Sequence, residues 1–138
     1  MGFMLNVDDS IKLGVDTIQT VDFAIDTPKD SDARTTDVSV TMTITGKVLT
    51  MEDDGTEGTV DLALWSMISA ETADCYKKVT VSVTASGQVV TEYSLTNAFV
   101  VDYSETYGDT EGVGTFKLII RQKKNAINST AVNGGYAS

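Results

Sequence analysis

The sequence predicts a mainly β protein with one short helix, and three observations carry this prediction. Hydrophobic residues occupy every second position in most of the chain, as they do in strands that bury one face. Only residues 58–71 place hydrophobic residues at helical spacing. The length of 138 residues and the hydrophobic content of 41% suit one core, so we expect a single domain over residues 1–138.

Six strands are expected, and three of them lie before residue 45. The first covers residues 2–7, a run rich in β-forming side chains. The second covers residues 15–26, where Val21, Phe23 and Ile25 share a face and only Ile18 breaks the alternation. The third covers residues 38–44, with the sequence VSVTMTI, and alternates without a break.

A long hairpin and a closing strand supply the other three. In residues 77–103, two alternating runs flank Ser86-Gly87-Gln88, where glycine provides the geometry of a turn. The closing strand covers residues 114–122, with the sequence GTFKLIIRQ. The side chains expected on the core face of the hairpin are Val79, Val81, Val83, Val89, Tyr93, Leu95, Phe99 and Val101.

One short helix is expected to pack on the sheet after the third strand. Thr59 is a suitable N-cap, and Asp61 is an acid at the end of the helix that favours negative charge. Val60, Leu64, Met67 and Ile68 fall at helical spacing, and Trp65, the only tryptophan, would add a large buried area. The helix residues that we expect in the core are Val60, Leu64, Trp65 and Ile68.

Two polar segments show no periodic pattern. They are the stretch from residue 26 to residue 37, which would form a long extended loop, and the C-terminal tail of residues 125–138. Both are long for a compact domain of this size. Each is either disordered or ordered by a molecule outside the domain.

Charge and composition exclude several classes of function. Twenty acidic and ten basic residues give a net charge of −10, which disfavours specific binding to nucleic acid. No hydrophobic run is long enough for a membrane-spanning helix. The single cysteine, Cys75, allows no internal disulfide, and no secretory leader is evident, so we expect the chain to be made in the cytoplasm.

The sequence contains no catalytic or metal-binding constellation that we recognise. Histidine, the commonest general base and zinc ligand, is absent. The acids near Tyr103 and Tyr107, which are Asp102, Glu105, Asp109 and Glu111, could converge on a cation, but turns between strands collect such residues. We expect no cofactor, no metal and no enzymatic activity.

The order of these segments resembles a known family. The sequence LTNAFVVDYSETY followed by GTFKLIIR, within residues 95–121, is similar to the last two strands of tube-forming proteins of contractile injection systems. These are the haemolysin-coregulated protein (Hcp) of type VI secretion and the tail-tube proteins of contractile phages and related particles. The resemblance extends from Gly2 to about Lys124.

The resemblance implies a fold and a function. It implies a small two-sheet β-barrel with one short helix packed on it and one long extended loop. It also implies six-membered rings that stack head to tail into a hollow tube, in contact with sheath and baseplate or spike proteins. We expect cytoplasmic assembly followed by incorporation into a phage tail, a bacteriocin-like particle or a secretion system, with possible cargo in the lumen. An excess of acids on the lumen surface would repel nucleic acid.

The same resemblance places the main contact between subunits in the extended loop. The mixed charges of that loop would fix the register against a neighbouring subunit. Tyr103 and Tyr107 would pack at a subunit or sheet boundary. The loop residues concerned are Pro28, Lys29, Asp30, Asp32 and Arg34.

Two alternatives stay open from the sequence. The chain could be a monomeric β-domain that binds carbohydrate or protein through Tyr93, Tyr103 and Tyr107. It could also be a hydrolase that uses two carboxylates, for instance Asp102 and Glu105. The first would stay monomeric, and the second would need both acids in one cleft.

Overall fold

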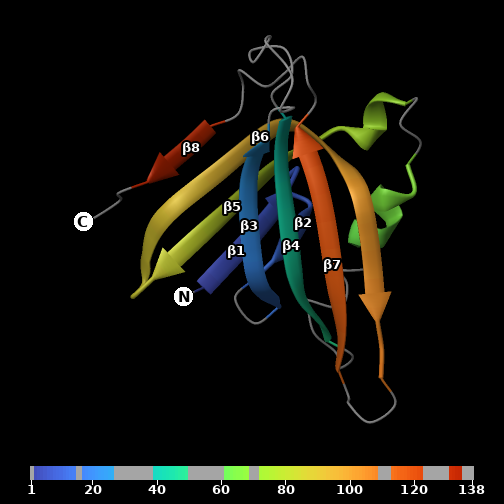
Figure 1. Ribbon diagram of the computed structural model, residues 1–138, viewed down its shortest axis with the longest axis horizontal. Helices are drawn as coiled ribbons and strands as arrows, with labels where there is room; N and C mark the ends of the chain where they lie inside the picture. Colours follow the sequence, from blue (N-terminus) through green and yellow to red (C-terminus); the bar gives the residue numbers. More distant parts are fainter. Residues whose placement is uncertain are drawn as a thin grey trace.

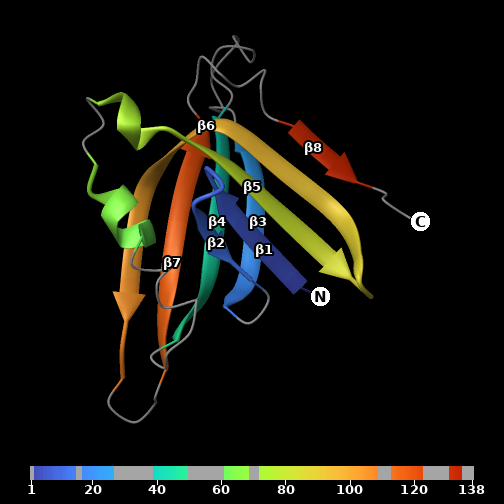
Figure 2. The same ribbon diagram turned by 180° about the vertical axis from the view of Figure 1, so that it is seen from behind.

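The computed structural model describes most of the chain as a bent antiparallel sheet (Figures 1 and 2). The described residues are 2–14, 17–26, 39–49, 61–68, 72–108, 113–122 and 131–134. The extended loop, Thr59, Val60 and most of the C-terminal tail therefore lie outside the described residues. Among the helical residues described, no helix is long and apolar enough to cross a membrane.

The prediction of a mainly β fold is confirmed, and two strands that the sequence did not indicate are present. The first strand has the expected bounds, whereas the short β2 and β8 were not predicted. A 3₁₀ turn, η1 (Ala73–Cys75), precedes β5. The strands are β1 (Gly2–Val7), β2 (Ile11–Leu13), β3 (Ile18–Asp26), β4 (Ser39–Leu49), β5 (Lys77–Ala85), β6 (Gln88–Thr106), β7 (Val113–Gln122) and β8 (Ala131–Gly134).

The strands follow the order β2-β1-β5-β6-β7-β4-β3, and β8 pairs with β6 beside this path. The 19-residue β6 pairs with β5 as far as Ala98 and with β7 from Ala98 onward. It bends between these two halves, so that β3, β4 and β7 form one layer and β1, β2 and β5 form another (Figures 1 and 2). The hydrogen-bonded sheet is open, because its described end strands β2 and β3 are not paired with each other. The closed two-sheet barrel is therefore not confirmed.

The core lies between the two layers. Residues from β1, β4, β5 and β7 alternate into it and are almost completely buried. Burial of each such side chain contributes roughly 1.5–3 kcal/mol of hydrophobic stabilisation. The largest fully buried hydrophobic side chains include Leu5, Met42, Ile44, Leu118 and Ile120.

The pairing of β6 is interrupted by three bulges, one of them near Val90, and the other two change which side chains beyond Leu95 face this core. The β5–β6 register shifts between the pairs Val79↔Leu95 and Lys77↔Ala98, and the β6–β7 register shifts between Val100 and Asp102. Each bulge inserts a residue and reverses the alternation that follows. Phe99 is therefore only half-buried, and Val101 is 42% exposed. The prediction that these two residues continue the core face of the hairpin is wrong.

The helical segment turns a different face to the core than the sequence suggested. Residues 61–66 are helical, and Leu62 and Trp65 are buried while Ile68 packs partly against the core. Trp65 Nε1 also donates a hydrogen bond to the carbonyl oxygen of Cys75, at 2.8 Å. Leu64 is 57% exposed, so the prediction that it lies in the core is wrong. Leu64 follows Leu62 by two positions, and such residues do not share a helix face.

We predict that Gly46→Ala destabilises the protein. Gly46 lies in β4, and a methyl group there would overlap the carbonyl oxygen of Thr17 and the ring of Phe116. The expected loss in the free energy of unfolding is about 1–3 kcal/mol, measured by chemical denaturation. Gly108→Ala is the matched control, because nothing lies within 4 Å of a Cβ at that position. Equal stability of the two variants would contradict the packing described here.

Candidate functional site: the open strand edges

The first open edge belongs to β3. This strand pairs with β4 on one side, and the described residues provide no strand on its other side. Gln19, Thr20, Asp22, Ala24 and Ile25 are all exposed. A long strand edge without a partner tends to pair with another chain, and monomeric β proteins usually protect such edges. The β3 edge is therefore a candidate contact surface.

The second open edge belongs to the second half of β6. Residues 98–106 pair with β7 on one side, and β5 reaches only to Ala98 on the other. Beyond Ala98, the described residues offer no strand partner on that other side. Val101, Asp102, Ser104, Glu105 and Thr106 are exposed. We call residues 99–106 the β6 edge.

The two edges lie at opposite ends of the same layer and run in opposite directions. β6 is antiparallel to β7, β7 to β4, and β4 to β3. Four alternating strands leave β3 pointing against β6. In Figure 1, β3 lies to the left of β4, and the second half of β6 lies to the right of β7. An edge-to-edge contact between two copies would therefore be antiparallel and continue the ladder.

The face of this layer that points away from the core is polar. Threonines follow β4 at every second position, and two of their hydroxyls bond across strands: Thr45 with Thr20, and Thr41 with Arg121 Nε, which donates at 3.2 Å. The described ionisable side chains that alternate onto this face are all exposed. They are the acids Asp22 and Asp102 and the cations Lys47, Lys117 and Arg121.

Tyr103 lies on the core side of the β6 edge. Its ring stacks on Phe116 with centroids 6.2 Å apart, and its hydroxyl donates to Glu105 Oε1 at 2.9 Å. Burial raises the pKa of Tyr103 far above its usual value, and the hydrogen bond to Glu105 and the charge of that carboxylate add to the shift. A phenol with a raised pKa is a poor general base near neutral pH. The ring of Tyr103 thus packs against the core at the β6 edge.

Tyr107 follows the β6 edge and is 57% exposed. Its ring lies over the backbone of Gly114 in β7, where a Cβ would overlap it. Glycine thus leaves room for the aromatic ring at the end of the β6–β7 pair. Tyr107 is the exposed aromatic side chain nearest to this edge in the sequence.

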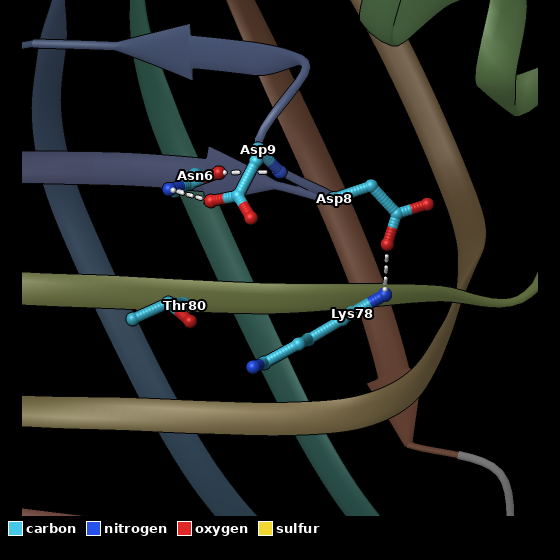
Figure 3. Close-up of a pocket in the computed structure, with 5 residues that line it drawn as sticks. All are labelled: Asn6, Asp8, Asp9, Lys78 and Thr80. Carbon is cyan, nitrogen blue, oxygen red and sulfur yellow. Dashed lines mark hydrogen bonds between the residues drawn. The ribbon is translucent and has the colours of Figure 1, made fainter.

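A small cavity lies on the opposite layer, where the β1–β2 turn meets β5 (Figure 3). Its volume is about 50 Å³ and its lining is Asn6, Asp8, Asp9, Lys78 and Thr80. Asp8 and Asp9 have positive φ angles of 52° and 60°, which aspartate tolerates better than most residues. Asn6 exchanges two hydrogen bonds with Asp9, at 2.9 and 3.0 Å, and these hold the turn.

Hydrogen bonding within the chain explains the polar groups of this cavity. The amide N–H of Lys78 donates to Asp8 Oδ1 at 2.8 Å, and that of Asp8 donates to the carbonyl oxygen of Lys78, also at 2.8 Å. Lys77 Nζ lies 3.8 Å from Asp8 Oδ2. In the described part of the chain, no group of three or more acidic, histidine or cysteine side chains is placed to hold a metal ion. The turn is better explained as a hydrogen-bonded connection between β1 and β5 than as a metal site.

The structure does not bring together the residues that either alternative function requires, the binding module with three tyrosines or the hydrolase with two carboxylates. Tyr93 stacks on Phe23 with centroids 4.4 Å apart, in the first half of β6, whereas Tyr103 packs on Phe116 in the second half. Tyr93, Tyr103 and Tyr107 therefore form no common patch. Asp102 and Glu105 alternate to opposite faces of β6, which disfavours a pair of cooperating carboxylates.

The loop residues assigned to the subunit contact, Pro28, Lys29, Asp30, Asp32 and Arg34, lie outside the described residues. The sequence pattern did not predict the two open edges. Each strand shows the usual alternation, and which side of a strand is left unpaired depends on partners distant in the sequence. The length of the β6 run, which exceeds that of β5, is the only signal that could have indicated an unpaired half.

We predict that Asp8→Ala lowers the free energy of unfolding by about 1–3 kcal/mol, because it removes the acceptor for Lys78 N–H and places alanine at a positive φ. Asp8→Asn keeps the acceptor and tolerates this φ, so its stability should stay within about 0.5 kcal/mol of the parent. Chemical denaturation of both variants checks this. A large loss in Asp8→Asn would mean that the ion pair with Lys77 matters more than the hydrogen bond.

We predict that Tyr103 ionises well above the usual pKa range of tyrosine in an alkaline titration followed by phenolate absorbance. Because its folded pKa is raised, the unfolded chain releases this proton first, and stability falls as the pH rises above about 10. Tyr103→Phe should remove the late ionisation and reduce the alkaline loss of stability. A titration unchanged by Tyr103→Phe would show that the phenol is not held as described.

Neither a protein-family model nor a curated protein sequence matches the chain. Solved structures do match it along nearly its whole length. Hcp1 from Flavobacterium johnsoniae is similar over 98% of this chain and 97% of its own, with a TM-score of 0.58 and 16% identity.

Two contractile particles contain similar chains. A chain of the PVC sheath–tube complex, from an extracellular contractile injection system in the extended state, has a TM-score of 0.59 and 15% identity. A chain of the anti-feeding prophage cap, the AFP tube terminating cap, has a TM-score of 0.58 and 13% identity. Each match covers 96% of this chain and 88% of the other. This chain therefore shares its fold with Hcp1 and with chains of contractile injection systems, the family that its sequence resembles.

Proposed function

We propose that the protein is a structural subunit of the inner tube of a contractile injection system or phage-tail-like particle. The observation that carries this proposal is the four-stranded layer with two open edges of opposite direction. When the β3 edge of one copy pairs with the β6 edge of the next, the contact is heterologous, and such contacts form rings when the rotation closes. The fold shared with Hcp1 and with the chain of the PVC sheath–tube complex supports the same function.

A six-membered ring built in this way has a wide bore. Six copies of a four-stranded layer form a wall of 24 strands, and a strand spacing of about 4.8 Å gives a backbone diameter of roughly 37 Å before strand tilt widens it. The bent sheet of each copy would then supply two layers of a barrel. The inner layer would be continuous around the ring. The second layer covers the apolar face, so the polar face of β3, β4, β7 and β6 lines the bore.

The side chains of this face are suited to line a bore through which cargo passes. Its threonine hydroxyls bind water and give cargo little apolar surface to adhere to. The described charges on this face are three cations and two acids, although the chain carries −10 overall. The acidic bore that would repel nucleic acid stays a prediction.

The proposal includes partners and a place of assembly. Rings stack head to tail and meet sheath, baseplate and spike proteins of the same machine, and assembly takes place in the cytoplasm. The protein acts as a wall and not as an enzyme, and Tyr103 and Tyr107 pack where two copies meet. The anti-feeding prophage cap and the PVC sheath–tube complex, which contain chains of this fold, support association with such components.

Size-exclusion chromatography with light scattering, followed by negative-stain microscopy of the main peak, tests the proposal. We expect six-membered rings or stacked tubes at high protein concentration. A strictly monomeric peak in all conditions, including the presence of preformed tube ends, would contradict the proposed function. It would favour the monomeric binding module instead.

The extended loop is proposed as a second contact between subunits. We predict that Lys29→Glu with Arg34→Glu weakens ring formation about tenfold or more while the monomer stays folded, because both changes reverse charges assigned to the contact. Lys12→Glu with Lys78→Glu is the matched control, since it changes the charge equally at two exposed side chains of the other layer. Circular dichroism checks the fold, and sedimentation measures assembly. Equal weakening by both pairs would point to net charge and not to the loop.

A further inference from the structure

Among the described residues, four of the eight large hydrophobic side chains that the structure leaves exposed lie in two pairs on opposite sides of the protein. Leu64 and Met67, 57% and 76% exposed, extend from the helical segment. Ile25 of β3 and Val132 of β8, 59% and 54% exposed, lie at the other side. Figures 1 and 2 show the helical residues (green) and β8 (red) at opposite ends of the molecule. The structure leaves more than half of each of these four side chains exposed.

Ile25 and Val132 lie on the strand faces that carry the stacked rings of Phe23 and Tyr93. Ile25 follows Phe23 by two positions and shares its strand face, and the ring of Phe23 stacks on Tyr93 across the layers. Val132 pairs directly with Tyr93 in the β6–β8 ladder, so it shares the face of Tyr93. We call these four residues the apolar rim. In the apolar rim the two rings stack on each other, and the two aliphatic side chains are exposed.

Leu64 and Met67 form a fixed projection. They lie three positions apart, and the amide of Met67 donates to the carbonyl oxygen of Leu64 at 3.2 Å. The segment is anchored by buried Leu62 and Trp65. We call Leu64 and Met67 the apolar knob. Because its base is held in the core, the backbone of the knob loses little conformational entropy when a partner covers it.

We infer that the apolar knob of one copy packs into the apolar rim of the next copy in the ring. This inference rests on the proposed function and names a contact that the paired edges do not include. The rim lies on the side of the β3 edge, and the knob lies on the side of the β6 edge (Figure 1). Pairing those two edges brings the knob of one copy against the open rim of its neighbour. The contact closes the open side of the two layers with hydrophobic surface.

The knob and the rim are different surfaces, so the occupant is a second copy placed head to tail. A contact of knob with knob would be isologous and would end at a dimer. A contact of knob with rim repeats from copy to copy and is compatible with any closed ring. The small size of each surface fits a contact that supplements strand pairing and does not replace it.

Cysteine pairs test this arrangement. The native Cys75 is buried, so Met67→Cys and Val132→Cys would each place one reactive thiol at the surface. Rings are first verified by light scattering and microscopy, and the thiols are then joined by a short bifunctional reagent. We expect cross-linked dimers when the two variants are mixed during assembly, and little cross-linking in rings of either variant alone.

Each outcome decides a separate point. Rings of the mixed variants that give no cross-link would overturn the knob-and-rim contact and leave the tube function standing. Cross-linking in rings of Met67→Cys alone would show a symmetric contact and would also overturn the inference. Failure of the parent chain to assemble in any condition, including the presence of preformed tube ends, would remove the proposed function together with the contact.

A polar substitution provides a second test that needs no cross-linking. Met67→Gln should weaken ring formation about tenfold, because the knob then loses hydrophobic burial at the contact. Met4→Gln is the matched control, since Met4 is also an exposed methionine, at 53%, and lies on β1 of the other layer. Equal assembly of Met67→Gln and the parent chain would overturn the inference. Circular dichroism confirms that both variants are folded.

Discussion

The architecture depends on one strand that serves two layers. β6 pairs with β5 along its first half and with β7 along its second half, and it bends where the partners change at Ala98. The bend brings the two halves of a single sheet face to face, so one hydrophobic core forms between them. Because β5 pairs only as far as Ala98, no described strand pairs with residues 99–106 on that side. Core formation and the open edge thus have a common cause.

An open edge at one end of a four-stranded layer is matched by the open edge of β3 at the other. The even number of strands makes the two edges run in opposite directions, which allows copies to join without breaking the antiparallel pattern. Exposed hydrophobic side chains lie beside both edges. A monomeric β protein would normally cover or charge such surfaces. The described part of the chain therefore leaves both strand edges unpaired, and in the proposed tube a neighbouring copy pairs with each of them.

Much of the fold could be predicted from the sequence, because alternation reports which strand face is buried. It placed β1 and the buried residues of β4 correctly. It did not indicate β2 or β8, which are too short to show a period. It also misplaced Leu64, since tertiary packing selected Leu62 and Trp65 as the buried helix face. The open edges could not be predicted, because the alternation of a strand is the same whether one or both of its sides are paired.

Hydrogen–deuterium exchange of assembled rings against the monomer tests the central claim most directly. If the β3 edge pairs with the β6 edge of the next copy, amides within residues 18–26 and 99–106 that point away from β4 and β7 should gain strong protection on assembly. The edge of β2, which takes no part in this contact, should exchange at the same rate in both states. Rings in which residues 18–26 and 99–106 exchange as fast as in the monomer would contradict the account.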